Sequence, residues 1–212
     1  MTLPVETGSA EALETLLTWR RDVRHFRAQA IPEDEMERLF ALTQLAPSVG
    51  NAQPWRFLRI RTPALRAALA DHVDAAVRKA GAAYDDPARS ALHASLKLHG
   101  LRDAPEVLAV FSDEAPAAGH GLGAATMPET RRYSTVLAIH TMWLAARSRG
   151  IGLGWVSILE PEGVAAMLDT PPHWHFMALL CLGYPQAESD VPELERRGWQ
   201  ARQNWRVHVG ER

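Results

Sequence analysis

ETRRYSTVLAIHTMWLAARSRGIGLGWVSIL, residues 129–159, joins a long helical pattern to a strand pattern through one glycine. Apolar residues lie on most sides of the first part, between Val136 and Leu144. They predict a helix over 129–149 that is enclosed by protein, either in the core of the chain or at an interface between two copies. Gly150 ends this helix, and the glycines of the strand at 151–159 allow a close approach to its backbone.

Further elements extend from this unit in both directions. Helical spacing predicts helices from residue 11, from Pro32 as the first helical position, over 63–79 and after Pro161, and strands are predicted at 55–61, 107–111 and 175–183. Helices and strands mix without a regular βαβ rhythm, so we predict an α+β fold in one domain, 1–212. The segment 81–101 is rich in Ala, charged residues and His without a core stripe, and we interpret it as a lid.

Composition excludes several classes of partner. The chain has 212 residues, of which 47% are hydrophobic, and a net charge of −2 with no basic stripe, so we expect no nucleic-acid partner. The apolar run 136–146 is shorter than the roughly 20 residues that span a bilayer, so we expect no membrane span. The N-terminal residues show no secretory signal pattern, and the single cysteine, Cys181, excludes an intrachain disulfide. Both features indicate the reducing cytoplasm.

The stretch RRDVRHF, residues 20–26, places Asp22 among Arg20, Arg21 and Arg24. In the simpler interpretation it is a solvated helix end with Asp22 paired to Arg24 or Arg20. In the other, the guanidinium groups capture a phosphate, whose oxygens they match bidentately. No phosphate-binding glycine loop of the P-loop or dinucleotide-binding type occurs, so arginines would have to hold any nucleotide.

Two further stretches contain candidate ligand groups. APSVGNAQPW, residues 46–55, is either an ordinary turn or a loop in which Ser48, Asn51 and Gln53 offer hydrogen bonds to a flat heterocycle. The glycines of GLGWVS, residues 152–157, either permit close strand packing or expose backbone amides to such a ring. Ser157 is accordingly a strand serine or a hydroxyl beside the ring.

Other potentially reactive residues give weaker evidence of a functional site. His173 and His175 would supply only two ligands, so no metal site is predicted. His140 lies on an apolar helix and Cys181 in an apolar strand, where both are expected to be packing residues. No G-x-S-x-G motif supports a hydrolase.

Together these stretches resemble the flavin nitroreductase superfamily and, within it, the BluB-type 5,6-dimethylbenzimidazole synthases. The likeness covers about residues 19–202 and rests on the following motifs: RRDVRHF at 20–26, APSVGNAQPWRF at 46–57, KLHGLRDAPEVLAVF at 97–111, GHGLGAATMPETRRYS at 119–134, GIGLGWVSILEP at 150–161 and PELERRGWQAR at 192–202. RRDVR and TMPETRRYS are the specific parts, because ordinary nitroreductases usually carry serine at the position of Asp22 and lack the TMPET run. The tail QNWRVHVGER departs from the pattern, which has an apolar segment there.

The resemblance implies a homodimer with a central, mostly antiparallel sheet flanked by helices, and FMN at the subunit interface. It implies that reduced FMN is both substrate and cofactor, and that dioxygen drives its fragmentation to 5,6-dimethylbenzimidazole, the lower ligand of cobalamin, and erythrose 4-phosphate. A separate flavin reductase would supply the reduced FMN. The alternatives are an NAD(P)H-dependent nitro- or quinone reductase with bound FMN, and a flavin-sequestering protein without chemistry.

Site residues follow from the same resemblance. It implies that Arg20, Arg21 and Arg24 hold the phosphate and flank the flavin, with Arg202 as a further phosphate partner. Asp22 would transfer protons, and Ser157 would orient the ring by hydrogen bonding. The remaining cofactor-binding residues that it implies are Val23, Ser48, Asn51, Gln53, Gly154 and Trp155. Because neighbouring arginines stabilise a carboxylate, we expect Asp22 to be ionised and ready to accept a proton.

Overall fold

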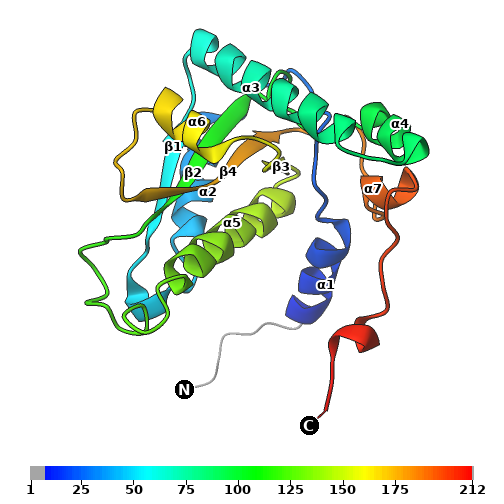
Figure 1. The fold of residues 1–212 in the computed structure, drawn as a ribbon. Helices are drawn as coiled ribbons and strands as arrows, with labels where there is room; N and C mark the ends of the chain where they lie inside the picture. Colours follow the sequence, from blue (N-terminus) through cyan, green and yellow to red (C-terminus); the bar gives the residue numbers. More distant parts are fainter. Residues whose placement is uncertain (1–7, 212) are drawn as a thin grey trace.

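The computed structural model describes residues 8–211, and its centre is a four-stranded antiparallel sheet in the order β1-β2-β4-β3 (Figure 1). The strands are β1 (Trp55–Arg59), β2 (Glu106–Asp113), β3 (Gly152–Val156) and β4 (Trp174–Gly183). In the register, Trp55 pairs with Ser112, Val107 with Cys181 and Leu153 with Leu182. All four predicted strands are present, and the expected antiparallel sheet is confirmed.

Seven α-helices and two short 3₁₀ turns occur in the described part of the chain. They are α1 (Ser9–Trp19), α2 (Glu33–Thr43), α3 (Pro63–Ala82), α4 (Pro87–Ser95), α5 (Thr130–Ser148), α6 (Pro161–Met167), α7 (Glu193–Arg196), η1 (Val49–Asn51) and η2 (Trp205–His208). Proline opens α3, α4 and α6, where its missing N–H would have no helical partner. Pro32 instead precedes α2 as its cap, one residue from the predicted place.

The sheet lies between two helical layers, because side chains on a strand alternate between its faces. Val107, Ala109 and Phe111 of β2 point into a core that α3 and α6 cover with Leu69 and Val164, among others. The intervening Leu108 and Val110 belong to a second core, which α2 and α5 cover with Met36, Leu39, Ile139 and Met142. The region of β2 and β4 is therefore buried on both faces.

Helix α5 is not enclosed within one chain, which excludes the first of the two alternatives, complete burial in the core of the chain. It buries Ala138, Ile139, Met142 and Ala146, but Tyr133, Val136 and Leu137 are 53%, 40% and 45% exposed. Neighbouring α1 has no buried residue at all. An exposed apolar stripe on a helix is typical of an interface, so the prediction of an interface between two copies stays open.

The segment predicted to be a lid, 81–101, contains the last turn of α3, the short helix α4 and an irregular stretch that returns to the sheet. In α4 only His93 is buried. Figure 1 shows α4 at one edge of the molecule, beside α7 and the C-terminal segment. Among residues 8–211, no helix has both the length and the apolar character needed to cross a membrane.

Candidate functional site

The segment that contains the arginines lies along the free edge of β3. Asp22 forms a parallel bridge with Leu153, and the Val23 N–H donates to the Leu153 carbonyl at 3.1 Å. Two residues further along β3, the Trp155 N–H donates to Asp22 Oδ1 at 2.8 Å. Residues 20–24 thus extend the sheet past β3, and the carboxylate of Asp22 takes the place of a backbone acceptor.

The glycines of β3 are explained by this close approach. A Cβ atom at position 154 would lie 2.1 Å from the carbonyl oxygen of Val23, and one at position 152 would lie 2.7 Å from Val23 Cγ2. Neither distance is compatible with a side chain. Of the two interpretations of GLGWVS, close packing accounts for Gly152 and Gly154, and the segment that packs against them is the arginine stretch.

Arg24 holds the carboxylate of Asp22 from the other side. Its Nε and Nη2 both lie 2.8 Å from Asp22 Oδ2, and its Nη1 donates to the Lys97 carbonyl at 3.1 Å. The Arg24 side chain is only 12% exposed. The ion pair therefore lies between β3 and the returning end of the segment 81–101.

Burial raises the pKa of the Asp22 carboxyl, and the charge of Arg24 and the Trp155 N–H oppose this shift only in part. Arg24 and Arg20 favour the ionised form, as expected, but the loss of hydration outweighs them, so the net shift of the Asp22 pKa is upward. A carboxyl with a raised pKa both accepts and retains a proton more readily than an exposed aspartate does. A raised pKa is a property that carboxyl groups in general acid–base catalysis often have.

Arg21 donates to backbone carbonyls, whereas Arg20 and the C-terminal Arg202 have free hydrogen-bond donors. Arg21 Nε donates to the Asp190 carbonyl at 3.0 Å, and its terminal nitrogens contact the carbonyls of Thr18, Arg20 and Asp190. The guanidinium of Arg20 stacks 4.6 Å from the ring centre of Trp143. Among residues 8–211 it has no hydrogen-bond acceptor, and the same holds for exposed Arg202.

These three cations lie close enough to repel one another. The pKa of Arg20 is lowered first by burial, and the charge of Arg202 lowers it further, whereas Asp22 raises it. The pKa of Arg21 is lowered by burial and then by Arg202 and Arg20. Such repulsion is relieved when an anion binds between the guanidinium groups. Guanidinium donors such as those of Arg20 and Arg202 can form bidentate hydrogen bonds with phosphate oxygens.

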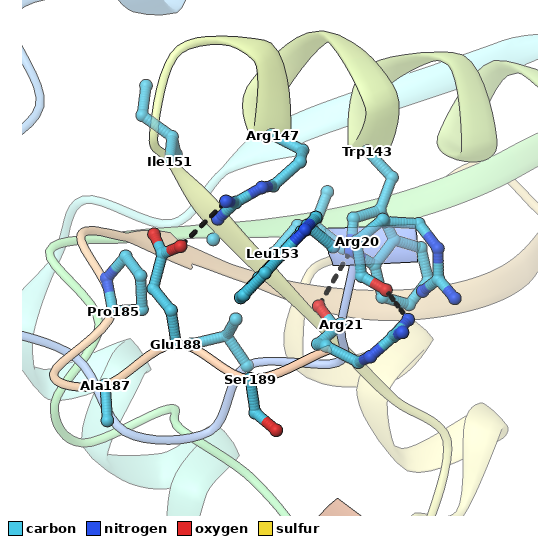
Figure 2. A pocket seen from close by; sticks show the side chains of 13 residues that line it. Arg20, Arg21, Trp143, Arg147, Ile151, Leu153, Pro185, Ala187, Glu188 and Ser189 are labelled. Carbon is cyan, nitrogen blue, oxygen red and sulfur yellow. Dashed lines mark hydrogen bonds and ion pairs between the residues drawn. The ribbon is translucent and has the colours of Figure 1, made fainter. Parts of the chain in front are cut away.

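Two hollows flank the arginine segment. The first is drawn in Figure 2, where the ion pair of Arg147 and Glu188, 2.7 Å long, lies across from Arg20 and Arg21. Its volume of about 30 Å³ has room for little more than one water molecule. The second, of about 260 Å³, is lined by residues 21–25, 186, 187, 189, 191, 193 and 196. Both fall below the ~300–1,000 Å³ of usual ligand pockets, so this edge of one chain is an incomplete site.

The loop 46–54 lies elsewhere in the chain. Its Ser48 Oγ accepts from the Gln53 N–H at 3.1 Å, Gln53 Nε2 donates to Asn51 Oδ1 at 3.1 Å, and the Val49 N–H donates to Ser134 Oγ at 3.0 Å. From Ser134 to Trp143, which lies under Arg20, α5 rises about 14 Å. One chain therefore does not bring Ser48, Asn51 and Gln53 to the arginines.

Ser157 follows directly after β3 and is exposed. It lies two residues beyond Trp155, which is about 7 Å along an extended chain from the N–H that holds Asp22. Gly154 and Trp155 are part of β3 itself. Gly154 and Trp155 thus share one strand edge with Asp22, Val23 and Arg24, and Ser157 follows in the chain directly after that strand.

Sequence patterns do not identify the residue that contacts the arginines from a distant part of the chain. Trp143 was interpreted only as an apolar residue of a buried helix, yet its Nε1 donates to the Arg21 carbonyl at 3.2 Å and its ring lies under Arg20. The only signal was an indole among aliphatic residues.

The histidines weighed as metal ligands form no metal site with their neighbours. His173 Nε2 lies 3.8 Å from Asp113 Oδ1, and residues 8–211 contain no group of three or more His, Cys, Asp or Glu side chains placed to hold a metal ion.

Comparison with known proteins agrees with this geometry. Residues 17–184 match the family described as "Nitroreductase family". The chain is 56% identical to the 5,6-dimethylbenzimidazole synthase of Rhodospirillum rubrum, with 91% of this chain and 90% of that protein covered. It is 52% identical to a 5,6-dimethylbenzimidazole synthase of Rhodobacter capsulatus, with 92% and 94% covered. A BluB-like flavoprotein from Clostridium difficile has the same fold, with a TM-score of 0.70 at 18% identity over 94% of this chain and 98% of that one.

Proposed function

The chain belongs to the nitroreductase family, and from this premise we propose that it is a 5,6-dimethylbenzimidazole synthase, which uses dioxygen to fragment reduced FMN. The products would include 5,6-dimethylbenzimidazole, for the lower ligand of cobalamin, and erythrose 4-phosphate, with the pyrimidine part of the flavin ring released as a further fragment. Two relatives more than half identical over about nine-tenths of the chain carry this enzyme name. The observation that carries the proposal is the partly buried Asp22, fixed at the edge of β3 beside a cluster of arginines.

The arginine cluster would bind the phosphate of FMN. Arg20 and Arg202 have free donors that can form bidentate hydrogen bonds, and Arg21 adds positive charge while its own donors hold the backbone. Stacking on Trp143 fixes the plane of the Arg20 guanidinium and so limits the entropy lost on binding. This phosphate grip would anchor the ribityl side of the substrate close to Asp22.

Asp22 would move protons at the substrate. Reduced FMN supplies the electrons for the reaction with dioxygen, and the cleavage of carbon bonds also requires proton removal from carbon or hydroxyl groups. The contacts of Asp22 with Arg24 and the Trp155 N–H keep the carboxyl in one orientation, which a positioned base needs. The hydroxyl of Ser157, further along the same strand edge, would orient the flavin ring by hydrogen bonding.

A second copy of the chain would complete the site. The loop with Ser48, Asn51 and Gln53 lies too far from the arginines in one chain, whereas the exposed apolar residues of α1 and α5 offer a surface for pairing. In such a homodimer, the loop of one protomer would face the arginine segment of its partner. The segment 81–101, joined to Arg24 through the Lys97 carbonyl, would cover the flavin and exclude water.

The test is a single turnover in air. The purified protein is loaded with FMNH₂ without oxygen, exposed to air, and its small-molecule products are separated by liquid chromatography and identified by mass spectrometry. Formation of 5,6-dimethylbenzimidazole is the expected result. Quantitative recovery of oxidised FMN would refute the proposal.

The alternative is an NAD(P)H-dependent nitro- or quinone reductase with bound FMN, which family membership alone would favour. Under the proposal, a separate flavin reductase in the cytoplasm supplies FMNH₂, and the protein itself oxidises NAD(P)H slowly or not at all. Pyridine nucleotide oxidation with a nitroarene as acceptor separates the two. Rapid turnover with intact flavin at the end would support the alternative.

A further inference from the structure

The C-terminal segment is attached to α4 through an aromatic cluster. The ring of Trp199 lies 5.7 Å from that of Tyr84 and 6.1 Å from that of His93, and the rings of Tyr84 and His93 are 5.4 Å apart. Tyr84 lies in the turn before α4, and His93 is the buried residue of α4. We call Tyr84, His93 and Trp199 the aromatic latch.

Two arginines tie the same parts together by hydrogen bonds. Arg89 of α4 places its guanidinium carbon 4.8 Å from the ring centre of Trp199, and its Nη1 donates to the Trp199 carbonyl at 3.1 Å. In the opposite direction, Arg197 Nη2 donates to the Ser95 carbonyl at the end of α4 at 3.0 Å. With contacts in both directions, α4 and residues 197–199 form one unit.

The same segment carries Arg202. Only Gln200 and Ala201 separate it from Trp199, so the two Cα atoms are at most about 10 Å apart. The chain from 200 to 204 has no helix or strand, and within residues 8–211 no hydrogen bond holds the Arg202 side chain. Its charge nevertheless acts on both Arg20 and Arg21. The docking of residues 197–199 on α4 therefore limits where Arg202 can lie relative to the arginine segment.

We propose that Trp199 is a positioning residue that couples recognition of the flavin phosphate to closure of α4. The proposal rests on the proposed function, because it takes the phosphate of FMN as the anion between Arg20 and Arg202. When the phosphate engages Arg202, the segment that follows Trp199 is fixed, and α4 is fixed with it through the aromatic latch. The protein would then distinguish FMN from riboflavin by the phosphate, and only FMN would order the lid.

The chain offers a matched control for the test. Trp205 lies in the same C-terminal segment with Arg206 4.7 Å from its ring centre, so it has the same kind of cation partner as Trp199. It is 62% exposed, and no contact joins it to α4 among those that the described residues make. Trp199→Ala, Trp199→Phe and Trp205→Ala are titrated with oxidised FMN and with riboflavin by flavin fluorescence, and amide exchange is measured over 87–95.

We expect Trp199→Ala to bind FMN about tenfold more weakly, the effect of one misplaced charged hydrogen-bond donor. Its riboflavin affinity should be that of the wild type, and FMN should no longer protect 87–95 from exchange. Trp199→Phe should restore most of the preference for FMN, and Trp205→Ala should behave as the wild type.

Several outcomes would overturn the coupling. An equal loss of affinity for both flavins in Trp199→Ala would assign Trp199 to packing alone. A ratio of FMN to riboflavin affinity equal to that of the wild type, or the same loss of FMN affinity in Trp205→Ala, would also exclude the coupling. These results would leave the proposed function intact if dimethylbenzimidazole still forms, whereas failure of the wild type to bind FMN would remove the proposed function itself.

Discussion

Replacing Gly154 by alanine tests how the site is built. The new Cβ would lie 2.1 Å from the carbonyl oxygen of Val23, a backbone atom that cannot rotate away. Residues 20–24 must therefore separate from β3. The hydrogen bond from the Val23 N–H to Leu153, 3.1 Å long, and that from the Trp155 N–H to Asp22, 2.8 Å long, would then break.

The expected cost follows from these two bonds. The neutral backbone bond contributes about 1 kcal/mol and the bond to the carboxylate about 2 kcal/mol, so the free energy of unfolding should fall by roughly 3 kcal/mol. Alanine also restricts the unfolded chain, but this gain of about 0.4–1 kcal/mol does not offset the loss. For a protein of this length, 3 kcal/mol corresponds to a decrease in Tm of roughly 10 °C.

Thermal and urea denaturation, followed by circular dichroism, measure this change. Gly210→Ala is the matched control, because a Cβ there would meet nothing within 4 Å and the backbone has no positive φ. It should unfold as the wild type does. Gly154→Ala should also lose dimethylbenzimidazole formation, since Asp22 moves with its segment. A Tm within about 2 °C of the wild type would refute the packing of residues 20–24 against β3.

Further predictions concern single groups of the site. Asp22→Glu keeps the charge but shifts the base by ~1 Å, so product formation should fall about 100-fold with FMN binding retained. An unchanged rate in the aerobic assay would count against a positioned base. Because burial raises the pKa of Asp22, ionisation of this group in the folded protein lowers the free energy of unfolding as the pH rises. Relative to the wild type, Asp22→Asn should therefore gain stability in urea denaturation from about pH 4 up to the folded-state pKa. A stability difference that does not change with pH would contradict this. Arg20→Met should weaken FMN binding in fluorescence titrations most at low ionic strength, with riboflavin unaffected; equal weakening of both would argue against phosphate binding. Burial raises the pKa of Cys181 to about 12, so iodoacetamide should modify this thiol only after unfolding, as mass spectrometry can show, and modification of the folded protein would be inconsistent with the buried strand.

The strands and most helices could be predicted from sequence because their signals are local. β2 and β4 are short apolar runs, and α3 and α6 begin at prolines. The enclosure of α5 could not be predicted in the same way. Its apolar residues on most sides indicate burial, but whether another element or another chain covers Val136 and Leu137 depends on tertiary contacts that no local pattern specifies.

For the site, the sequence indicated the important segments but not their geometry. RRDVR identified Asp22 and its neighbours, and the glycines of GLGWVS indicated a close approach without saying what approaches. The direction of the pKa shift at Asp22 could not be predicted, because the sequence shows the arginines and not the loss of hydration. Contacts between distant residues, such as Arg20 with Trp143 and Arg89 with Trp199, depend on how α5 and the C-terminal segment pack.

We propose that Asp22 transfers the protons needed to fragment a flavin that the arginine cluster binds by its phosphate. The most direct measurement compares the wild type with Asp22→Asn, both loaded with the same amount of FMNH₂ and exposed to air. We expect 5,6-dimethylbenzimidazole from the wild type, and from the variant only oxidised FMN despite equal binding. Equal yields of dimethylbenzimidazole from both proteins would contradict it.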